Sequence, residues 1–336
     1  MEESAPALRS FDYAAAAKES VACPLCGQAS FERLATIDRY GMGLATVGCR
    51  GCGLVQTRPR LTVSGFADFY RQSYRAYYQG VVEPSEAYVR QMKKDGRLDA
   101  TVAWLLAEGA SDGAAAVLDV GCSEGTLFAA LRRAGFSGPL RGVEPSDSFR
   151  AYTRERHGAE VVASESDLPD SWRGTIGLVT LIHVLEHVAD PVATLAHLRG
   201  FLARDGHLYI DVPDVAEYSS LNDLHIAHIF HFSAGTLRTT LLAAGFEVAR
   251  LEAHRPAGHP PSLRALARPV EAPVGVGHAG EAGPPGTDRP LEGDPPGWAE
   301  VRRINRARHR LALKRFIRAT LARSRVYTAL RARRRR

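Results

Sequence analysis

Short apolar runs and helical apolar spacings alternate along residues 86–268. Apolar runs of about four to eight residues are typical of strands, and apolar positions that recur every three or four residues are typical of helices. The run at 176–182 (IGLVTLI) is almost continuously apolar, as expected for a strand buried on both faces. Strands are predicted at 116–120, 140–144, 160–163, 176–182, 207–212, 246–254 and 262–268.

Cap and breaker residues predict helices between these strands. Asp147 is a candidate N-cap, Pro191 suits a first helical turn, and Ser233 is a second candidate N-cap. Helices are predicted at 86–108, 126–135, 147–157, 191–203 and 234–244. This alternation predicts an α/β fold with a doubly wound, Rossmann-like sheet of seven strands.

Length and composition favour a two-domain protein with appendages. The chain has 336 residues, of which 45% are hydrophobic, so a large core can be buried. No apolar stretch approaches the roughly 18–20 residues that a membrane span needs. The first residues (MEESAPALRS) lack the basic and hydrophobic regions of a secretory signal, so we expect a cytoplasmic protein.

The net charge of +6 hides an uneven distribution. Residues 299–336 carry fifteen Lys and Arg against one acid, Glu300, whereas the remaining residues carry more acids than bases. The preceding segment 269–298 is rich in Pro and Gly and is predicted to be a disordered linker. For the basic tail, contact with the inner membrane face, binding of nucleic acid and a solvated tail remain open. The acidic body makes nucleic acid the less favoured partner.

Four of the five cysteines form two C-x2-C pairs within a short N-terminal segment. Cys23 and Cys26 are followed, after 22 residues, by Cys49 and Cys52. Two such turns supply the four thiolates of a tetrahedral Zn²⁺ site, so residues 21–62 are predicted to be a zinc-binding module. All four ligand positions would be sulfur, which makes the zinc structural. Two disulfides are the alternative, and the absence of a secretory signal disfavours them.

A candidate nucleoside pocket lies at the ends of the first two strands of the sheet. The stretch 117–125 reads VLDVGCSEG and the stretch 143–145 reads VEP. Gly121 and Gly125 allow a ligand to approach the backbone, and Asp119 and Glu144 end their strands, where a carboxylate can accept ribose hydroxyls. The turn lacks the G-x-G-x-x-G spacing of NAD binders, and the chain has no phosphate-binding loop.

These motifs, with LVTLIHVLEHVADP (178–191), resemble the motif series of class I S-adenosylmethionine (SAM)-dependent methyltransferases. The resemblance covers residues 98–268. It implies that Asp119, Gly121 and Gly125 border the methionine part of SAM and that Glu144 holds the ribose. Asp167 matches the acidic residue that meets the adenine amino group, and His183 would lie beside the cofactor.

The order of segments resembles bacterial zinc-binding methyltransferases of sugar and polysaccharide pathways. In the sugar C-methyltransferases among them, a Glu-His pair supplies a base. Here LHIAHIFHFS (224–233) places His228 at the histidine, but Ala227 stands where the family has glutamate. We expect His228 to be the general base, with His231 as the second candidate.

Two further motifs are weighed against simpler explanations. HVLEH (183–187) fits a zinc-protease string, but that chemistry needs the segment on a helix, whereas here it follows a predicted strand. His225, His228 and His231 are three residues apart, and on a helix the first and last would point apart, so a shared metal is not expected.

Among the aromatic residues of 66–78, Tyr74 and Tyr77 are candidates for binding the substrate, and packing between modules is the alternative.

The sequence therefore predicts six segments: a flexible N-terminus (1–20), the zinc module (21–62), an aromatic and helical connector (63–110), a SAM-dependent methyltransferase core (111–268), the linker (269–298) and the basic tail (299–336). The expected acceptor is a small-molecule or lipid-linked sugar of polysaccharide biosynthesis. The alternatives are an RNA methyltransferase and a non-catalytic SAM-binding scaffold.

Overall fold

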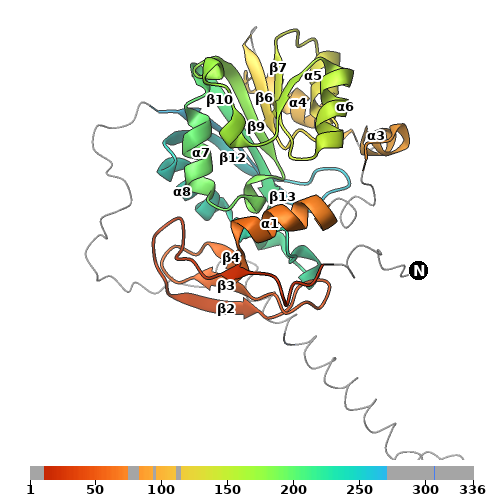
Figure 1. The fold of residues 1–336 in the computed structure, drawn as a ribbon. Helices are drawn as coiled ribbons and strands as arrows, with labels where there is room; N and C mark the ends of the chain where they lie inside the picture. The colour runs from red at the N-terminus through yellow and green to blue at the C-terminus, as the bar shows by residue number, and fades with distance from the viewer. Residues whose placement is uncertain (1–10, 75–82, 94–95, 111–114, 271–305, 307–336) are drawn as a thin grey trace, which may run out of the picture.

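A central sheet with helices on both faces stands on a smaller N-terminal β module in the computed structural model of the chain (Figure 1). The structure describes residues 11–74, 83–93, 96–110, 115–270 and 306. The predicted linker and tail lie outside these residues, except for 269–270 and Arg306.

The central sheet has the seven strands that the sequence predicts, in the order β12-β13-β10-β9-β6-β7-β8. Its bounds are β6 Ala116–Val120, β7 Leu140–Val143, β8 Glu160–Val162, β9 Ile176–Ile182, β10 Leu202–Pro213, β12 Phe246–His254 and β13 Ser262–Pro269. Neighbouring strands from β10 to β8 run parallel, whereas β13 is antiparallel to both β10 and β12. The carboxyl ends of the parallel strands therefore meet at one edge, where such folds bind ligands.

Helices cover both faces of this sheet, and each face has its own apolar core. On one face α4 (Arg97–Ala107) and α5 (Thr126–Arg133) pack through residues such as Leu105 and Phe128. On the other, α7 (Pro191–Arg199) and α8 (Ala234–Ala243) pack through residues such as Leu195 and Leu241. The helix α6 (Asp147–His157) lies beside α5 in Figure 1. The doubly wound α/β prediction is thus confirmed.

Some helix boundaries and one cap residue differ from the prediction. The helix expected at 86–108 is two helices, α3 (Glu86–Lys93) and α4, because Gly96 has φ +64° and cannot continue a right-handed helix. The helix α7 ends at Arg199 rather than at 203, because β10 already begins at Leu202. Ser146 occupies the N-cap position of α6, so Asp147 lies in the first turn instead. Ser233 caps α8 as expected, accepting a hydrogen bond from the Thr236 amide at 3.3 Å.

The N-terminal module contains a four-stranded sheet in the order β11-β4-β3-β2. Its strands are β2 Phe31–Ala35, β3 Thr46–Cys49, β4 Val55–Thr57 and β11 Phe230–His231. The last strand comes from the distant histidine-rich segment and pairs antiparallel with β4, which the sequence did not predict. A two-stranded ribbon joins β1 (Lys18–Glu19) to β5 (Arg60–Leu61), so part of the N-terminus expected to be flexible is paired.

The connector is helical where the structure describes it. The helix α1 (Val63–Phe69) continues into a π-helical turn at Tyr70–Tyr74.

Short 3₁₀ turns occur at Glu165–Asp167, Asp170–Trp172, Leu185–His187, Val215–Glu217 and Leu221–Asp223. Among the described residues, no helix has both the length and the apolar character needed to cross a membrane.

The module is packed against the carboxyl edge of the large sheet. One continuous core joins residues of the module, such as Leu61 and Phe69, to Leu181 of β9 and to Phe230. The Arg60 guanidinium donates to the Ala189 carbonyl at 2.6 Å, just beyond that edge. The module therefore covers the end of the sheet where the candidate site residues gather.

Candidate functional site

The turn between β6 and α5 places Asp119 at the carboxyl edge of the sheet. Asp119 is 5% exposed, and one carboxylate oxygen accepts a hydrogen bond from the Thr180 hydroxyl at 2.6 Å. Burial raises the pKa of Asp119 to about 7, and the neighbouring carboxylates of Glu124 and Glu144 add to this effect. Asp119 is thus fixed by the adjacent strand β9 rather than left free in solvent.

Gly121 and Gly125 both have backbone angles that require glycine. Their φ values are +79° and +77°. A Cβ on Gly121 would lie 2.6 Å from a methyl group of Val184, and a Cβ on Gly125 would overlap the His157 ring. The two glycines therefore keep the turn tight and let Val184 and His157 pack directly against its backbone.

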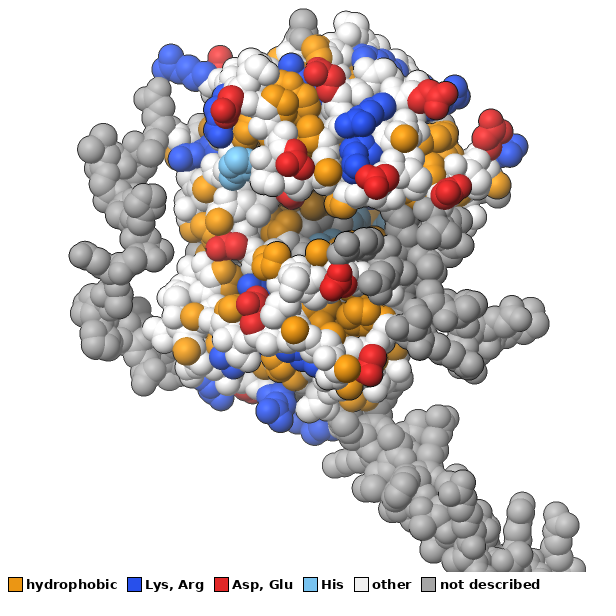
Figure 2. All heavy atoms as spheres, in the orientation of Figure 1, with side chains coloured by type: hydrophobic (Ala, Val, Ile, Leu, Met, Phe, Trp, Pro, Cys, Tyr) orange, Lys and Arg blue, Asp and Glu red, His pale blue; other side chains and the backbone are white. Residues whose placement is uncertain are grey.

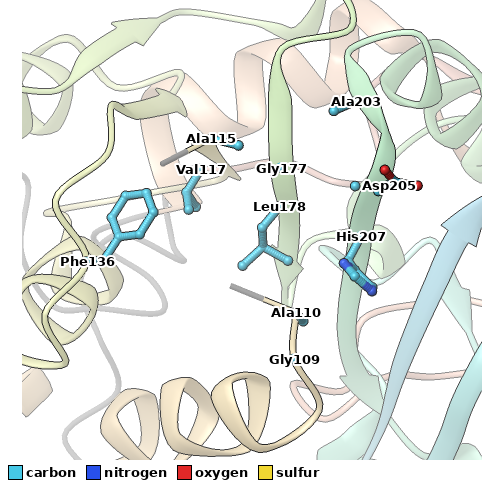
Figure 3. A pocket seen from close by; sticks show the side chains of 11 residues that line it. Gly109, Ala110, Ala115, Val117, Phe136, Gly177, Leu178, Ala203, Asp205 and His207 are labelled. Carbon is cyan, nitrogen blue, oxygen red and sulfur yellow. The ribbon is translucent and has the colours of Figure 1, made fainter. Parts of the chain in front are cut away.

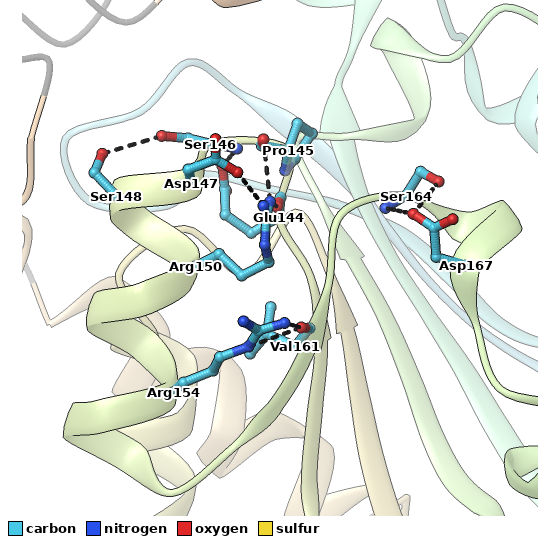
Figure 4. Close-up of polar contacts among 10 residues, drawn as sticks. All are labelled: Glu144, Pro145, Ser146, Asp147, Ser148, Arg150, Arg154, Val161, Ser164 and Asp167. Carbon is cyan, nitrogen blue, oxygen red and sulfur yellow. Dashed lines mark hydrogen bonds and ion pairs between the residues drawn. The ribbon is translucent and has the colours of Figure 1, made fainter.

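Glu144 connects the first and second strand ends. Its carboxylate accepts a hydrogen bond from the Ser146 amide at 2.7 Å (Figure 4). It accepts a second from the Ser123 amide at 3.2 Å. Glu144 is 4% exposed, and Ser123 has φ +50°. These two bonds hold the carboxylate in place at the strand end, where the nucleoside-pocket interpretation needs it.

Asp167 and His183 lie on two other loops of the same domain. The Asp167 carboxylate accepts hydrogen bonds from the Ser164 amide at 3.1 Å and its hydroxyl at 2.8 Å, which is a local capping box (Figure 4). His183 directly follows β9 with φ +53°, and its amide donates to the Asp211 carbonyl at 2.8 Å. Because Val184 lies over Gly121, His183 is adjacent to the cofactor turn.

A cluster of imidazoles, here called the histidine cluster, surrounds Glu186 and comprises His183, His187, His225, His228 and His231. The ring centroids of His225 and His228 are 3.7 Å apart, those of His187 and His228 are 4.9 Å apart, and those of His228 and His231 are 5.8 Å apart. Histidine side chains are visible in the hollow between the central sheet and the module (Figure 2).

The cluster is built by turns rather than by a helix. Residues 185–187 form a single 3₁₀ turn, which rules out the helical metal site of a zinc protease at HVLEH. The segment 225–231 passes through a turn into β11, with the Ile229 amide donating to the Glu186 carbonyl at 2.8 Å. This hydrogen bond places Glu186 and His187 beside His228, a grouping that helical spacing within 225–231 could not predict.

Burial favours the neutral form of four rings of the cluster. It lowers the pKa of His187, and it lowers the pKa values of His225 and His228 well below the usual range. The pKa of His231 falls to about 3, and its Nδ1 forms a hydrogen bond with the Tyr218 hydroxyl at 2.9 Å. The neutral rings have lone pairs that can accept a proton or bind a metal.

The aromatic connector reaches this cluster. The Tyr74 ring meets the His187 ring edge to face at 6.0 Å, and the Tyr70 ring meets it at 6.3 Å. Tyr77 lies outside the described residues. Sequence reasoning did not single out Glu186, His187 or Tyr70, although HVLEH and the aromatic run both contained the signal.

The four predicted cysteine ligands converge in the N-terminal module. The Sγ atoms of Cys23 and Cys52 are 3.5 Å apart, and those of Cys26 and Cys49 are 3.4 Å apart. A disulfide bond is about 2.05 Å long, so neither pair is bonded. Sulfurs about 2.3 Å from a tetrahedral Zn²⁺ stand about 3.8 Å apart, close to the observed spacing.

The two cysteine turns have the same backbone design. Amides of Gly27 and Gly53 donate to the carbonyls of Cys23 and Cys49, at 2.8 and 2.9 Å. Both glycines have positive φ, +71° and +81°. The repeated turn aims two sulfurs from each side at a common centre, and the group fits a four-sulfur metal site.

A separate cavity of about 180 Å³ lies at the opposite edge of the sheet (Figure 3). Its walls include Ala115, Gly177 and His207, near the amino ends of β6, β9 and β10. Because ligands of such sheets bind at the carboxyl edge, this cavity is distinct from the candidate site.

Comparison with known proteins gives a matching family for the central domain. Residues 88–251 match the family model described as a methyltransferase domain. A stretch of 98 residues is 31% identical to the ubiquinone biosynthesis O-methyltransferase of Vibrio campbellii, covering 28% of this chain and 41% of that relative. The chain thus spans about two fifths of the length of the curated relative it matches.

Solved structures share the fold at low sequence identity. The structure of the Burkholderia thailandensis 1,6-didemethyltoxoflavin-N1-methyltransferase, with its substrate and S-adenosylhomocysteine bound, superposes with a TM-score of 0.50 at 20% identity, over 68% of this chain and 97% of that one. A SAM-bound magnesium protoporphyrin IX methyltransferase from Synechocystis gives a TM-score of 0.43 at 19% identity, over 61% and 97%.

Proposed function

We propose that this chain, whose residues 88–251 match a methyltransferase domain, uses SAM to methylate a sugar or glycan precursor, nucleotide-linked or lipid-linked, in the cytoplasm. The proposal places the acceptor at the histidine cluster. The observation that carries it is the position of this cluster, which lies beside the cofactor turn and under the cysteine module. The order of cysteine module, aromatic segment and core along the chain resembles that of sugar-pathway enzymes.

Side chains at the first two strand ends would hold SAM. Asp119, Gly121 and Gly125 border its methionine part in this proposal, and Glu144 accepts hydrogen bonds from its ribose hydroxyls. Asp167 is proposed for the adenine end and His183 for the side facing the acceptor. When bound, SAM supplies an electrophilic methyl group, and alignment and exclusion of water account for much of the acceleration.

His228 is the residue we propose for activating the acceptor. Its imidazole is neutral at pH 7 and carries a lone pair that can take the proton of a hydroxyl or of a carbon beside a carbonyl, a contribution of about 10²- to 10⁴-fold. His231 remains the second candidate, although its Nδ1 is engaged by Tyr218. Tyr74, whose ring meets His187, is proposed to contact the acceptor, as is Tyr77.

Cys23, Cys26, Cys49 and Cys52 are proposed to bind one structural Zn²⁺. Four thiolates fill a tetrahedral ion and leave no position for water, so this metal has no place in the chemistry. Its role is to stabilise a module that is too small to fold on its own core.

A phenolic acceptor is the second candidate, favoured by the 98-residue match to a ubiquinone biosynthesis O-methyltransferase. It shares with a sugar the need for a hydroxyl aligned with the methyl group. The neutral rings of the histidine cluster suit either acceptor, so the choice between them is made by assay.

Transfer of labelled methyl from SAM tests the proposal directly. The zinc-loaded full chain is assayed with nucleotide-sugars, lipid-linked glycans, small phenols and RNA. Label in a sugar fraction supports the proposal, whereas label only in phenols or only in RNA contradicts the sugar acceptor. SAM binding without transfer to any class indicates a scaffold.

Two variants separate cofactor binding from acceptor activation. His228→Ala is expected to lower turnover at least about 100-fold while SAM binding, measured by calorimetry, is unchanged. Glu144→Ala is expected to weaken SAM binding about 10- to 100-fold, because one charged acceptor is lost. Unchanged turnover in His228→Ala would remove this residue from the mechanism.

A further inference from the structure

Glu186 is a buried carboxylate without hydrogen bonds. It is 1% exposed, and neither of its carboxylate oxygens accepts a hydrogen bond from the described residues. Burying an ionised carboxylate without such bonds costs several kcal/mol. A buried charge of this kind calls for a cationic partner.

Three imidazole nitrogens face one oxygen of this carboxylate. Glu186 Oε1 lies 3.4 Å from His183 Nδ1, and 3.9 Å from both His187 Nε2 and His228 Nε2. One carboxylate oxygen thus lies within 4 Å of a ring nitrogen from each of three histidines.

The tautomer of His187 is set by the backbone. Its Nδ1 lies 2.8 Å from the Ala227 carbonyl, which can only accept a hydrogen bond, so Nδ1 carries the proton. The lone pair is then on Nε2, the nitrogen that faces Glu186. A histidine that donates one ring N–H to a carbonyl and presents the other nitrogen has the arrangement found for metal ligands.

His228 presents a second ring nitrogen to the same centre. One ligand atom each from Glu186, His187 and His228 lies within 4.8 Å of the others. Ligands about 2.1 Å from a tetrahedral ion stand about 3.4 Å apart, so shifts of about half an ångström would close the observed 3.9 Å separations around an ion.

We propose that Glu186, His187 and His228 bind one divalent transition-metal ion, separate from the zinc of the cysteine module. Two imidazoles and one carboxylate suit Zn²⁺, Fe²⁺ or Co²⁺ rather than Mg²⁺ or Ca²⁺, which prefer oxygen ligands. Three protein ligands leave a coordination position open, which an oxygen atom of a small molecule can occupy.

The role of this ion rests on the proposed function, because the open coordination position lies at the proposed acceptor site. An acceptor that presents a hydroxyl or carbonyl oxygen to the ion is oriented beside the cofactor turn. The lone pair of His228 cannot bind an ion and accept a proton at once, so the two roles separate experimentally: a base acts without added metal, and a ligand needs it.

Titration with Co²⁺ tests the site without SAM or acceptor. The full chain, with Zn²⁺ bound by its cysteines, is dialysed and titrated by calorimetry and absorbance. We expect one further Co²⁺ per chain, bound without the charge-transfer absorption that thiolate ligands produce. X-ray absorption at the cobalt edge should show nitrogen and oxygen neighbours rather than sulfur.

Matched variants identify the ligands. Glu186→Gln and His228→Gln are expected to weaken Co²⁺ binding at least about 10-fold for each lost ligand, whereas His197→Gln, on the exposed face of α7, should bind as the wild type does. Circular dichroism checks that each variant folds. The Co²⁺ absorption spectrum of the wild type tests the site even if a variant does not fold.

The proposal is overturned if the wild type takes up no second ion, if sulfur surrounds the cobalt, or if the folded Glu186 and His228 variants bind it unchanged. Methyl transfer that proceeds fully without a second ion would refute this site and leave the proposed function standing. A bound second ion with no methyl transfer to any acceptor would support this site and refute the proposed function.

Discussion

At the scale of single residues, Gly121 shows how close the cofactor turn lies to the acceptor side of the domain. A Cβ at this position would reach within 2.6 Å of Val184, the residue next to His183. A side chain at Gly121 would therefore push apart the turn and the strand end that together form the site.

Gly121→Ala is expected to destabilise the fold by about 2–4 kcal/mol, from the strained φ and the overlap with Val184. It should also weaken SAM binding. Gly135→Ala is the matched control, because Gly135 also has positive φ, +93°, but has open space around its Cβ. Urea unfolding and calorimetry measure both effects, and equal losses in the two variants would show that the overlap is unimportant.

Asp119 predicts a pH dependence of stability. Its pKa is raised by burial to about 7, from about 3.9 in an unfolded chain. A raised pKa in the folded state means that this group favours folding fully at low pH and that its contribution is lost as pH rises through 7. Asp119→Asn keeps an oxygen for Thr180 but removes the ionisation.

The free energy of unfolding of Asp119→Asn, relative to the wild type, is therefore expected to rise between about pH 4.5 and pH 8 by on the order of a few kcal/mol. Chemical denaturation at a series of pH values measures it. Asp170→Asn, whose side chain is 90% exposed, is the control. A difference that does not change with pH would contradict the assigned burial effect.

The sequence was sufficient to predict site residues that belong to short motifs. It was insufficient to predict site residues whose partners lie far away along the chain. The spacing of the cysteines and the strand-end positions of Asp119 and Glu144 follow from short motifs. Glu186 was missed because its partner His228 lies 42 positions further along the chain. Asp147 was mistaken for an N-cap because both Ser146 and Asp147 have side chains suited to capping.

At the scale of elements, the strand β11 joins the module to the acceptor side of the site. Phe230 and His231 pair with Gln56 and Val55 of β4, and the Thr57 amide donates to the Ile229 carbonyl at 2.8 Å. A two-residue strand has no periodicity to detect, so sequence patterns could not predict it. The strands of the large sheet were predictable because their apolar residues alternate along the chain with segments of helical spacing.

Loss of the cysteine site is therefore expected to disturb the distant histidines. In Cys49→Ser, zinc content should fall and hydrogen exchange of peptides covering 225–232 should become at least about 10-fold faster, as β4 loses its support. Cys122→Ser, in the cofactor turn and outside the four-sulfur group, is the control for cysteine removal. Unchanged protection of 225–232 in a zinc-free chain would refute this coupling.

At the scale of the whole molecule, charge separates the described body from the basic segment 299–336. Each Lys or Arg near an anionic membrane contributes about 1 kcal/mol, so fifteen of them would form a strong anchor if the tail is a membrane contact as predicted. The prediction that the tail contacts a membrane concerns residues that, apart from Arg306, lie outside the described ones, and it stays a proposal.

A chain ending at Val270 is expected to bind SAM within about twofold of the full chain, because β13 is complete at Pro269. It should lose binding to phosphatidylserine vesicles, which sedimentation measures, while neither chain should bind neutral phosphatidylcholine vesicles. Equal binding of both chains to the anionic vesicles would exclude the tail as the anchor.

The pairing of β11 with β4 also bears on how the polypeptide matures on the ribosome. The first three strands of the small sheet are synthesised by residue 57, but the fourth, Phe230–His231, emerges more than 170 residues later. Until then β4 has an unprotected edge, and such edges invite pairing with other nascent chains. Early capture of metal by the cysteines would hold the unfinished sheet together during this interval.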